Sequence, residues 1–130
     1  METHMKKKYP PGLSDNLLVS LWRKAVLLRG GYKCAVCASG GKLECHHVIH
    51  RRYKMLRWYA PNGIPVHPDC HAEADFRGLS MLDDDVREDL VTNAQVTFKQ
   101  FLTRWGMTES EWRAAVKADL LRELAAAGGA

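Results

Sequence analysis

Residues 43–75 read LECHHVIHRRYKMLRWYAPNGIPVHPDCHAEAD and hold five of the six histidines and two of the four cysteines of the chain. Two more cysteines, Cys34 and Cys37, come shortly before this stretch. Reduced to its reactive groups, the region runs Cys-x2-Cys, His-His, Asn, His-x2-Cys-His. This density of thiol and imidazole groups predicts two interleaved metal sites, one that stabilises the fold and one that supports chemistry.

Two ligand pairs predict a structural zinc site. Cys34 and Cys37 are separated by two residues, and His67 and Cys70 repeat that spacing after an interval of 29 residues. Two such pairs supply the four ligands of a tetrahedral Zn²⁺. Two alternatives are open: a Cys-x2-Cys can be a redox pair, and Cys45 could replace His67. We favour zinc held with His67, and Cys45 as a small buried residue.

The remaining polar groups predict a second metal site. His71 follows Cys70 directly, and successive helical residues point about 100° apart, so His71 must face away from the zinc ligands. Asp75 is four residues further on and therefore shares a helix face with His71. With His46 and His47 from the preceding segment, these groups suit a hard divalent ion such as Mg²⁺ or Mn²⁺.

The pattern His-His-x14-Asn-x8-His, with Cys-x2-Cys before it and a cysteine directly before the last histidine, resembles the motif of HNH (ββα-metal) endonucleases. The similarity covers residues 34–75 and is strongest to the zinc-ribbon HNH nucleases of phages and prophages, some of which nick one strand. The chain departs from that pattern in having His67 where a cysteine is more common and an additional histidine at position 50.

The resemblance implies a role for each residue of the motif. His47 would be the general base that takes a proton from the attacking water, and His46 and His71 would hold the catalytic divalent ion. Asn62 would orient the loop and hold His47 in position, and Asp75 stands where some members of the family have a third metal ligand. In a regular strand His46 and His47 point to opposite faces, so the family geometry implies that the strand ends or twists there.

The segment between His47 and Asn62 is rich in cations. Cations of this kind position a nucleic-acid backbone, which favours DNA contact over the alternative of a solvated loop. The predicted DNA-contacting residues are His50, Arg51, Arg52, Lys54 and Arg57. In the same segment, Trp58 is predicted to be a core residue rather than a stacking platform for bases.

Net charge is unevenly distributed along the chain. Residues 1–78 carry 13 Lys and Arg against 6 Asp and Glu, whereas residues 79–130 carry 6 against 9. A basic first part beside an acidic second part indicates that the first part meets a polyanion, although an uneven solvated surface would give the same count.

The sequence predicts an α+β fold: a small ββα-metal core with a zinc knuckle, flanked by an N-terminal helix and C-terminal helices. Apolar residues at helical spacing predict a first helix that Ser14 or Asp15 caps and that Gly30 ends. Residues 32–49 are expected to form a hairpin, followed by a short edge strand at 64–66 and a helix over 67–78.

The outer helices are predicted to serve packing. The first is interpreted as a brace, although cations on its outer face could reach phosphates, namely Arg23, Lys24 and Arg29. A long amphipathic helix is expected over 83–105, and a last helix over 109–127 begins at the capping box Thr108–Glu111. Because the C-terminal helices carry no plausible chemical group, we predict that they form a packing or oligomerisation surface.

We divide the chain into a flexible basic lead-in (1–12), a zinc-ribbon nuclease core with its N-terminal helix (13–78) and a helical extension packed on that core (79–130). No apolar run is long enough to cross a bilayer, and the N-terminal residues lack the apolar segment of a secretory signal. We therefore expect a cytoplasmic protein, of a bacterium or a phage-infected host, that binds DNA as a monomer or homodimer.

The predicted function is that of a metal-dependent HNH DNA endonuclease, nicking or double-stranded, with structural Zn²⁺ and catalytic Mg²⁺ or Mn²⁺. The alternative is a zinc-ribbon DNA-binding module without catalysis. Such a module needs only the zinc ligands, so the additional motif residues favour the enzyme. A redox protein is a third alternative, but no thioredoxin-like βαβ pattern surrounds Cys34 and Cys37.

Overall fold

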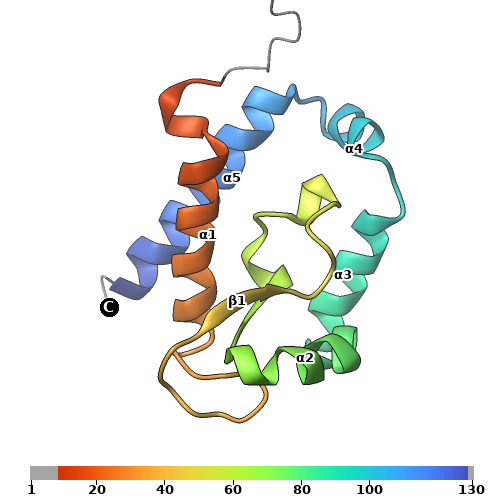
Figure 1. The fold of residues 1–130 in the computed structure, drawn as a ribbon. Helices are drawn as coiled ribbons and strands as arrows, with labels where there is room; N and C mark the ends of the chain where they lie inside the picture. The colour runs from red at the N-terminus through yellow and green to blue at the C-terminus, as the bar shows by residue number, and fades with distance from the viewer. Residues whose placement is uncertain (1–8, 129–130) are drawn as a thin grey trace, which may run out of the picture.

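A computed structural model describes residues 9–128 of the chain (Figure 1). Over these residues the fold is α+β, with five α-helices and one two-stranded antiparallel sheet. The elements in chain order are α1 Asp15–Arg29, β1 Glu44–His47, β2 Gly63–Val66, α2 His71–Arg77, α3 Asp84–Ala94, α4 Phe98–Trp105 and α5 Glu109–Gly128. The predicted lead-in lies mostly outside the described residues.

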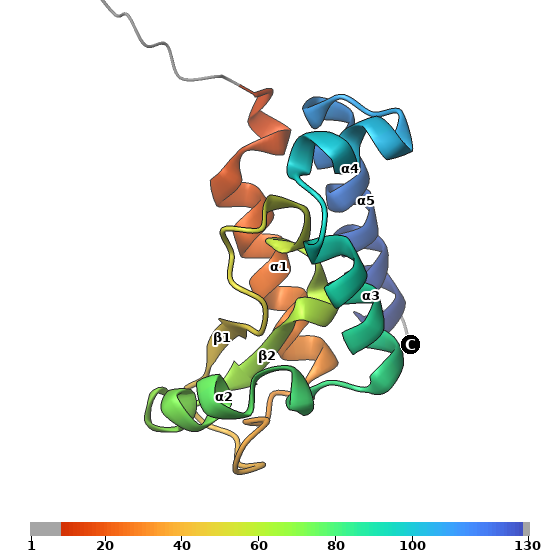
Figure 2. The same cartoon turned by 90° about the vertical axis from the view of Figure 1, so that its right-hand side faces the viewer.

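The sheet pairs β1 with β2, with Cys45 opposite Pro65 and His46 opposite Ile64. Only His67 and the 3₁₀ turn Pro68–Cys70 separate β2 from α2, so the order strand, strand, helix is as predicted. Figure 2 shows the two strands side by side, with α2 across one end of the sheet and α1 behind it.

The predicted hairpin over 32–49 is wrong. The residues from Tyr32 to Leu43 form turns, and β1 pairs with β2 across a longer connection. Tyr32 and Ala38 have φ angles of 58° and 66°, a left-handed conformation that an extended strand does not contain. The turns that present the two cysteines of this segment therefore replace the expected first strand.

Helix α1 has the predicted ends. The Ser14 hydroxyl accepts a hydrogen bond from the Leu17 N–H at 3.2 Å, and Gly30 caps the C-terminus. Glycine lets the sheet approach this helix closely, because a Cβ at Gly63 would overlap the side chains of Trp22 and Val26. The first helix therefore packs directly against β2 as well as against α5.

The long helix predicted over 83–105 is instead two helices, α3 and α4. The break is at residues 95–97, where Thr97 starts α4 with a capping box. Its hydroxyl accepts from the Gln100 N–H at 3.0 Å, and the Gln100 side chain accepts from the Thr97 N–H at 2.9 Å. The last helix begins at Glu109, with the predicted capping box between Thr108 and Glu111.

The main apolar core lies between α1 and α5 and includes Trp58. Trp58 is buried and its ring stacks on that of Trp112 at 5.6 Å, which confirms it as a core residue. The buried Arg113 of α5 donates to the Leu13 carbonyl at 2.8 Å and pairs with Asp15 at 2.7 Å. None of the helices over 9–128 is both long and apolar enough to traverse a membrane.

Candidate functional site

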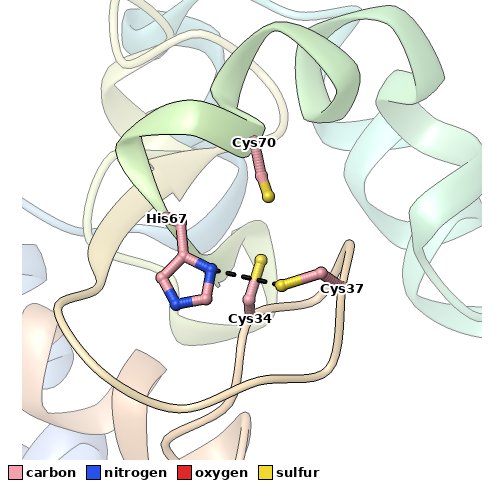
Figure 3. A group of neighbouring side chains, drawn as sticks. All are labelled: Cys34, Cys37, His67 and Cys70. Carbon is pink, nitrogen blue, oxygen red and sulfur yellow. Dashed lines mark hydrogen bonds between the residues drawn. The ribbon is translucent and has the colours of Figure 1, made fainter.

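Four side chains form what we call the thiolate cluster: Cys34, Cys37, His67 and Cys70. One ligand atom from each lies within 4.8 Å of the others, and Figure 3 shows the four groups converging. The two N-terminal cysteines come from the turns after α1, whereas His67 directly precedes the 3₁₀ turn between β2 and α2 and Cys70 is its last residue. The cluster could hold a metal ion such as zinc.

Backbone hydrogen bonds fix the turn that carries the first two cysteines. The Cys34 N–H donates to the Ser39 carbonyl at 2.8 Å, and the Val36 N–H donates to the Cys34 sulfur at 3.4 Å. The Ala35 N–H donates to the carbonyl of Pro65 in β2 at 2.8 Å. This last bond ties the turn to the strand that leads into the other two ligands.

The tautomer of His67 is set by the chain. Its Nε2 lies 2.5 Å from the Gly40 carbonyl oxygen, which can only accept, so the proton is on Nε2. In the neutral ring Nδ1 then carries the lone pair, and it lies 3.2 Å from the Cys37 sulfur (Figure 3). A neutral imidazole with this nitrogen facing the thiols is suited to be the fourth metal ligand.

The thiols differ in their ease of ionisation. Burial raises the pKa of Cys34, but hydrogen bonds from the backbone of Cys37, His67 and Val36 outweigh it and bring the pKa to about 6. Burial and hydrogen bonds with the other two thiols raise the pKa of Cys70 to about 11. The cluster thus favours thiolates at the turn, and a cation would be needed to deprotonate the third thiol.

Cys45 lies outside the thiolate cluster. Its sulfur is 3.5 Å from the Arg23 carbonyl, and it packs against the core around α1. Burial raises the pKa of this thiol, as expected for a packed cysteine. The structure therefore groups His67 with Cys34, Cys37 and Cys70, and leaves Cys45 outside the cluster as a residue that is half-buried rather than buried as predicted.

Three further groups form the imidazole–carboxylate cluster: His46, His71 and Asp75, whose ligand atoms lie within 4.8 Å of one another. His46 Nδ1 is 2.9 Å from His71 Nε2, and its Nε2 is 3.5 Å from an Asp75 oxygen. His46 is 9% exposed, whereas the Asp75 side chain is 64% exposed. The cluster is therefore anchored on β1 and open to solvent on the side of α2.

His47 faces the opposite side of β1. Its ring stacks on that of Trp22 at 4.1 Å with an interplanar angle of 9°. Its Nε2 lies 2.9 Å from the Arg57 carbonyl oxygen, so the proton is on Nε2 and Nδ1 is unprotonated. Burial is the main reason that the pKa of His47 is lowered, which keeps the ring neutral.

Strand β1 ends at His47, where the resemblance requires the strand to end or twist. His46 contacts α2 and His47 contacts α1, so the alternation of a regular strand holds up to that point. Sequence reasoning did not anticipate the role of Trp22, which it marks only as an apolar position of the first helix. Its Nε1 donates to the Tyr59 carbonyl at 3.0 Å, which fixes the ring against His47.

Asn62 is fully buried and clamps the loop that follows His47. Its Oδ1 accepts from the Ile49 N–H at 2.7 Å, and its Nδ2 donates to the carbonyls of Ile49 at 2.9 Å and Leu56 at 3.2 Å. The ring nitrogen of His47 is held by Arg57 of this loop. Asn62 therefore acts on His47 through the loop conformation rather than through a bond to the ring.

The predicted DNA-contacting residues are distributed unevenly around this site. Arg51 and Arg57 line a cleft of about 420 Å³ that also contains His47. The Arg57 Nε donates to the Arg51 carbonyl at 2.9 Å, which orients its guanidinium along the loop. These two cations are therefore the predicted contacts that border the histidine.

The other three predicted contacts are engaged elsewhere. Lys54 Nζ lies 5.4 Å from the ring centre of Phe98 in α4, and the Arg52 guanidinium lies 5.2 Å from that of Tyr53. His50 Nδ1 accepts from the Arg52 N–H at 3.0 Å. None of the three is among the residues that line the cleft with His47.

Comparison of the chain with protein-family models, curated protein sequences and solved structures finds no match. Its function is therefore inferred from the residues and their arrangement.

Proposed function

We propose that this chain is a metal-dependent DNA endonuclease of the HNH type that hydrolyses phosphodiester bonds, with His47 as general base and a divalent ion held by His46, His71 and Asp75. The observation that carries the proposal is the pair of adjacent histidines at the end of β1. One belongs to a cluster of three groups that could hold a metal ion, and the other is a neutral imidazole with an unprotonated nitrogen.

His47 has the properties that a general base requires. The Arg57 carbonyl holds the proton on Nε2, so Nδ1 is available to accept a proton from water. Stacking on Trp22 fixes the ring plane, and the lowered pKa keeps the imidazole in the form that can accept. The Arg57 carbonyl would also stabilise the imidazolium that forms when Nδ1 is protonated.

The imidazole–carboxylate cluster would hold the catalytic ion. It offers three ligands and an exposed side, which leaves coordination positions for water and phosphate. When bound there, Mg²⁺ or Mn²⁺ would supply positive charge that stabilises the phosphate oxygens during hydrolysis. The thiolate cluster would hold a structural Zn²⁺, because four ligands that include three thiols leave no open position.

The alternative, a zinc-binding DNA module without catalysis, needs only the thiolate cluster. DNA binding alone would require neither the imidazole–carboxylate cluster nor a fixed tautomer of His47. Their presence at the end of one strand is what favours the enzyme.

Incubation of supercoiled plasmid with the purified protein and Mg²⁺ or Mn²⁺ tests the proposal. We expect open-circular or linear DNA, abolished by EDTA, and the form produced distinguishes nicking from double-strand cleavage. His47→Ala should retain its zinc and its thermal unfolding temperature but cleave about 10²–10⁴ times more slowly, the usual contribution of a positioned general base.

Two results would contradict the proposal. Plasmid that stays supercoiled with every metal, while the protein still shifts DNA on a gel, would support the binding module. Near-normal cleavage by His47→Ala would remove this histidine from the mechanism.

A further inference from the structure

The cleft beside His47 has a second wall that lies outside the β1–β2–α2 unit. Helix α1 contributes Arg23 and Trp22 to it, and the segment after β1 contributes Arg51 and Arg57. We call this cleft of about 420 Å³ the arginine cleft. It brings Arg23 of α1 together with two cations that lie 28 and 34 residues later in the sequence, around one histidine.

The arginine cleft is strongly positive. Its one carboxylate, that of Asp15, is already paired with Arg113 at 2.7 Å. Arg23 and Arg51 are exposed, and within residues 9–128 neither guanidinium makes a hydrogen bond or an ion pair. Two unpaired guanidinium groups facing a concave surface are suited to bind an anion, and guanidinium matches phosphate geometry particularly well.

The other cations of α1 are not equivalent to Arg23. Arg29 pairs with Glu123 of α5 at 2.8 Å, and Lys24 does not line the cleft. Of the three cations that the sequence marks on this helix, only Arg23 reaches the surface that contains His47.

The position of the cleft indicates which phosphate it would take. A phosphate under attack must be reached by His47 and by the imidazole–carboxylate cluster, which faces α2, so it must lie at the end of β1. The arginine cleft lies on the α1 side of that point. A strand carries a phosphate at every nucleotide, so the cleft is where a neighbouring phosphate would lie.

We infer that the arginine cleft is a subsite for a backbone phosphate next to the bond that is cut, and that Arg23 is a positioning residue supplied by α1. This inference rests on the proposed nuclease function. It adds a helix outside the HNH-like motif to the substrate-binding surface, and it requires a polynucleotide, since a single phosphodiester has no neighbouring phosphate to bind.

Binding of a fluorescently labelled DNA duplex, measured by anisotropy without Mg²⁺ or Mn²⁺, tests the subsite independently of cleavage. We expect Arg23→Ala to weaken binding about tenfold, the loss of one charge-assisted contact. The slope of log affinity against log salt should fall by about one. Arg23→Lys should restore part of the affinity, because a charge remains.

Lys24→Ala is the matched control, because it removes the same charge from the adjacent residue of the same helix. It should bind DNA within about twofold of the unaltered chain. If Arg23→Ala and Lys24→Ala have equal effects, or if Arg23→Ala has none, the subsite does not exist. Polyglutamate could also compete with the labelled duplex as effectively as unlabelled DNA does. That result would show that the cleft binds acidic polypeptides as well as it binds DNA, and it would also overturn the inference.

Hydrolysis of bis(p-nitrophenyl) phosphate separates positioning from chemistry. Arg23→Ala should hydrolyse this small diester at the rate of the unaltered chain, while its KM for DNA rises. Equal losses on both substrates would overturn the positioning role. If the unaltered chain cuts neither substrate but Arg23→Ala still weakens DNA binding selectively, the nuclease proposal fails and the phosphate site stands.

Discussion

The thiolate cluster and the imidazole–carboxylate cluster contain adjacent residues, Cys70 in the first and His71 in the second. They nevertheless differ in the number and type of their groups and in their exposure to solvent. The first joins two segments through four ligands, and a backbone hydrogen bond from Ala35 to Pro65 reinforces that junction. The second has three ligands, two of them on one short helix, and its carboxylate is largely exposed. Soft, closed coordination suits a structural ion, and a hard, open set suits an exchangeable one.

The comparison implies a one-way dependence. Cys70 precedes the first residue of α2, so the thiolate cluster fixes the start of the helix that carries His71 and Asp75. Nothing in the arrangement makes the thiolate cluster depend on those two side chains. Losing the first cluster should therefore abolish both, whereas losing the second should leave the first intact.

The largest effect is expected from Cys70→Ala. Removing one thiolate should abolish zinc binding, which is worth about 10–16 kcal/mol in small zinc domains and is comparable to the whole stability of a domain. Metal analysis should show no bound zinc, and circular dichroism should show unfolding well below the temperature of the unaltered chain.

Cys45→Ala is the control, because it removes a thiol outside the thiolate cluster. It should keep one equivalent of zinc and lose little stability. Full zinc content and an unchanged unfolding temperature in Cys70→Ala would refute the structural role of the cluster.

His71→Ala should separate the two clusters. Zinc content and unfolding temperature should stay unchanged, while Mn²⁺ binding, followed by electron paramagnetic resonance, should be lost. Plasmid cleavage should fall by at least about 100-fold, because a catalytic ion contributes several kcal/mol to the transition state. Loss of zinc from this variant would mean that the clusters are not independent.

Asn62→Ala should destabilise the loop that follows His47 without removing a residue of either cluster. It leaves the N–H and the carbonyl of Ile49 without their hydrogen bonds to the amide, whereas the Leu56 carbonyl keeps the bond from the Tyr59 N–H, so we expect a loss of about 1–3 kcal/mol in the free energy of unfolding. Urea unfolding measures it. Asn93→Ala, which removes an amide bonded only within α3, should change stability by less than about 0.5 kcal/mol. Equal losses would contradict the clamp.

The smallest effect is expected from Asp75→Asn. Its side chain is exposed and water can replace one ligand, so Mn²⁺ affinity should fall about tenfold, equivalent to about 1.4 kcal/mol. Glu73→Gln, on the same helix but paired with Arg77, is the control. An equal loss of Mn²⁺ affinity in Glu73→Gln would show that the net negative charge of the helix, rather than coordination by Asp75, sets the affinity for the ion.

The parts of the structure that sequence predicts well are those encoded by local chemistry. Ser14 and Thr108 cap the helices that they were expected to cap, and the spacing of the ligand pairs anticipates both clusters. The break before α4 also had a local signal, the capping pair Thr97 and Gln100. The apolar period that continues through residues 95–97 concealed it.

The remaining features depend on contacts that no local pattern specifies. The turns around Cys34 need left-handed residues at Tyr32 and Ala38, which are not glycine and so give no warning. The acceptor that sets the tautomer of His47 is a backbone carbonyl, which every residue possesses. Its stacking partner Trp22 is 25 positions away and differs in no sequence property from an ordinary core tryptophan.

Gly63 permits the close approach of α1 to β2. This contact determines which segment of the chain could be moved into another protein with its structure intact. The recognisable motif occupies residues 34–75, but a graft of that stretch alone would leave behind the indole against which His47 rests. It would also expose the side of β2 that fits around Trp22 and Val26. The smallest portable unit therefore begins at Asp15, and a fragment trimmed to the motif would carry both clusters without the tryptophan that orients the His47 ring.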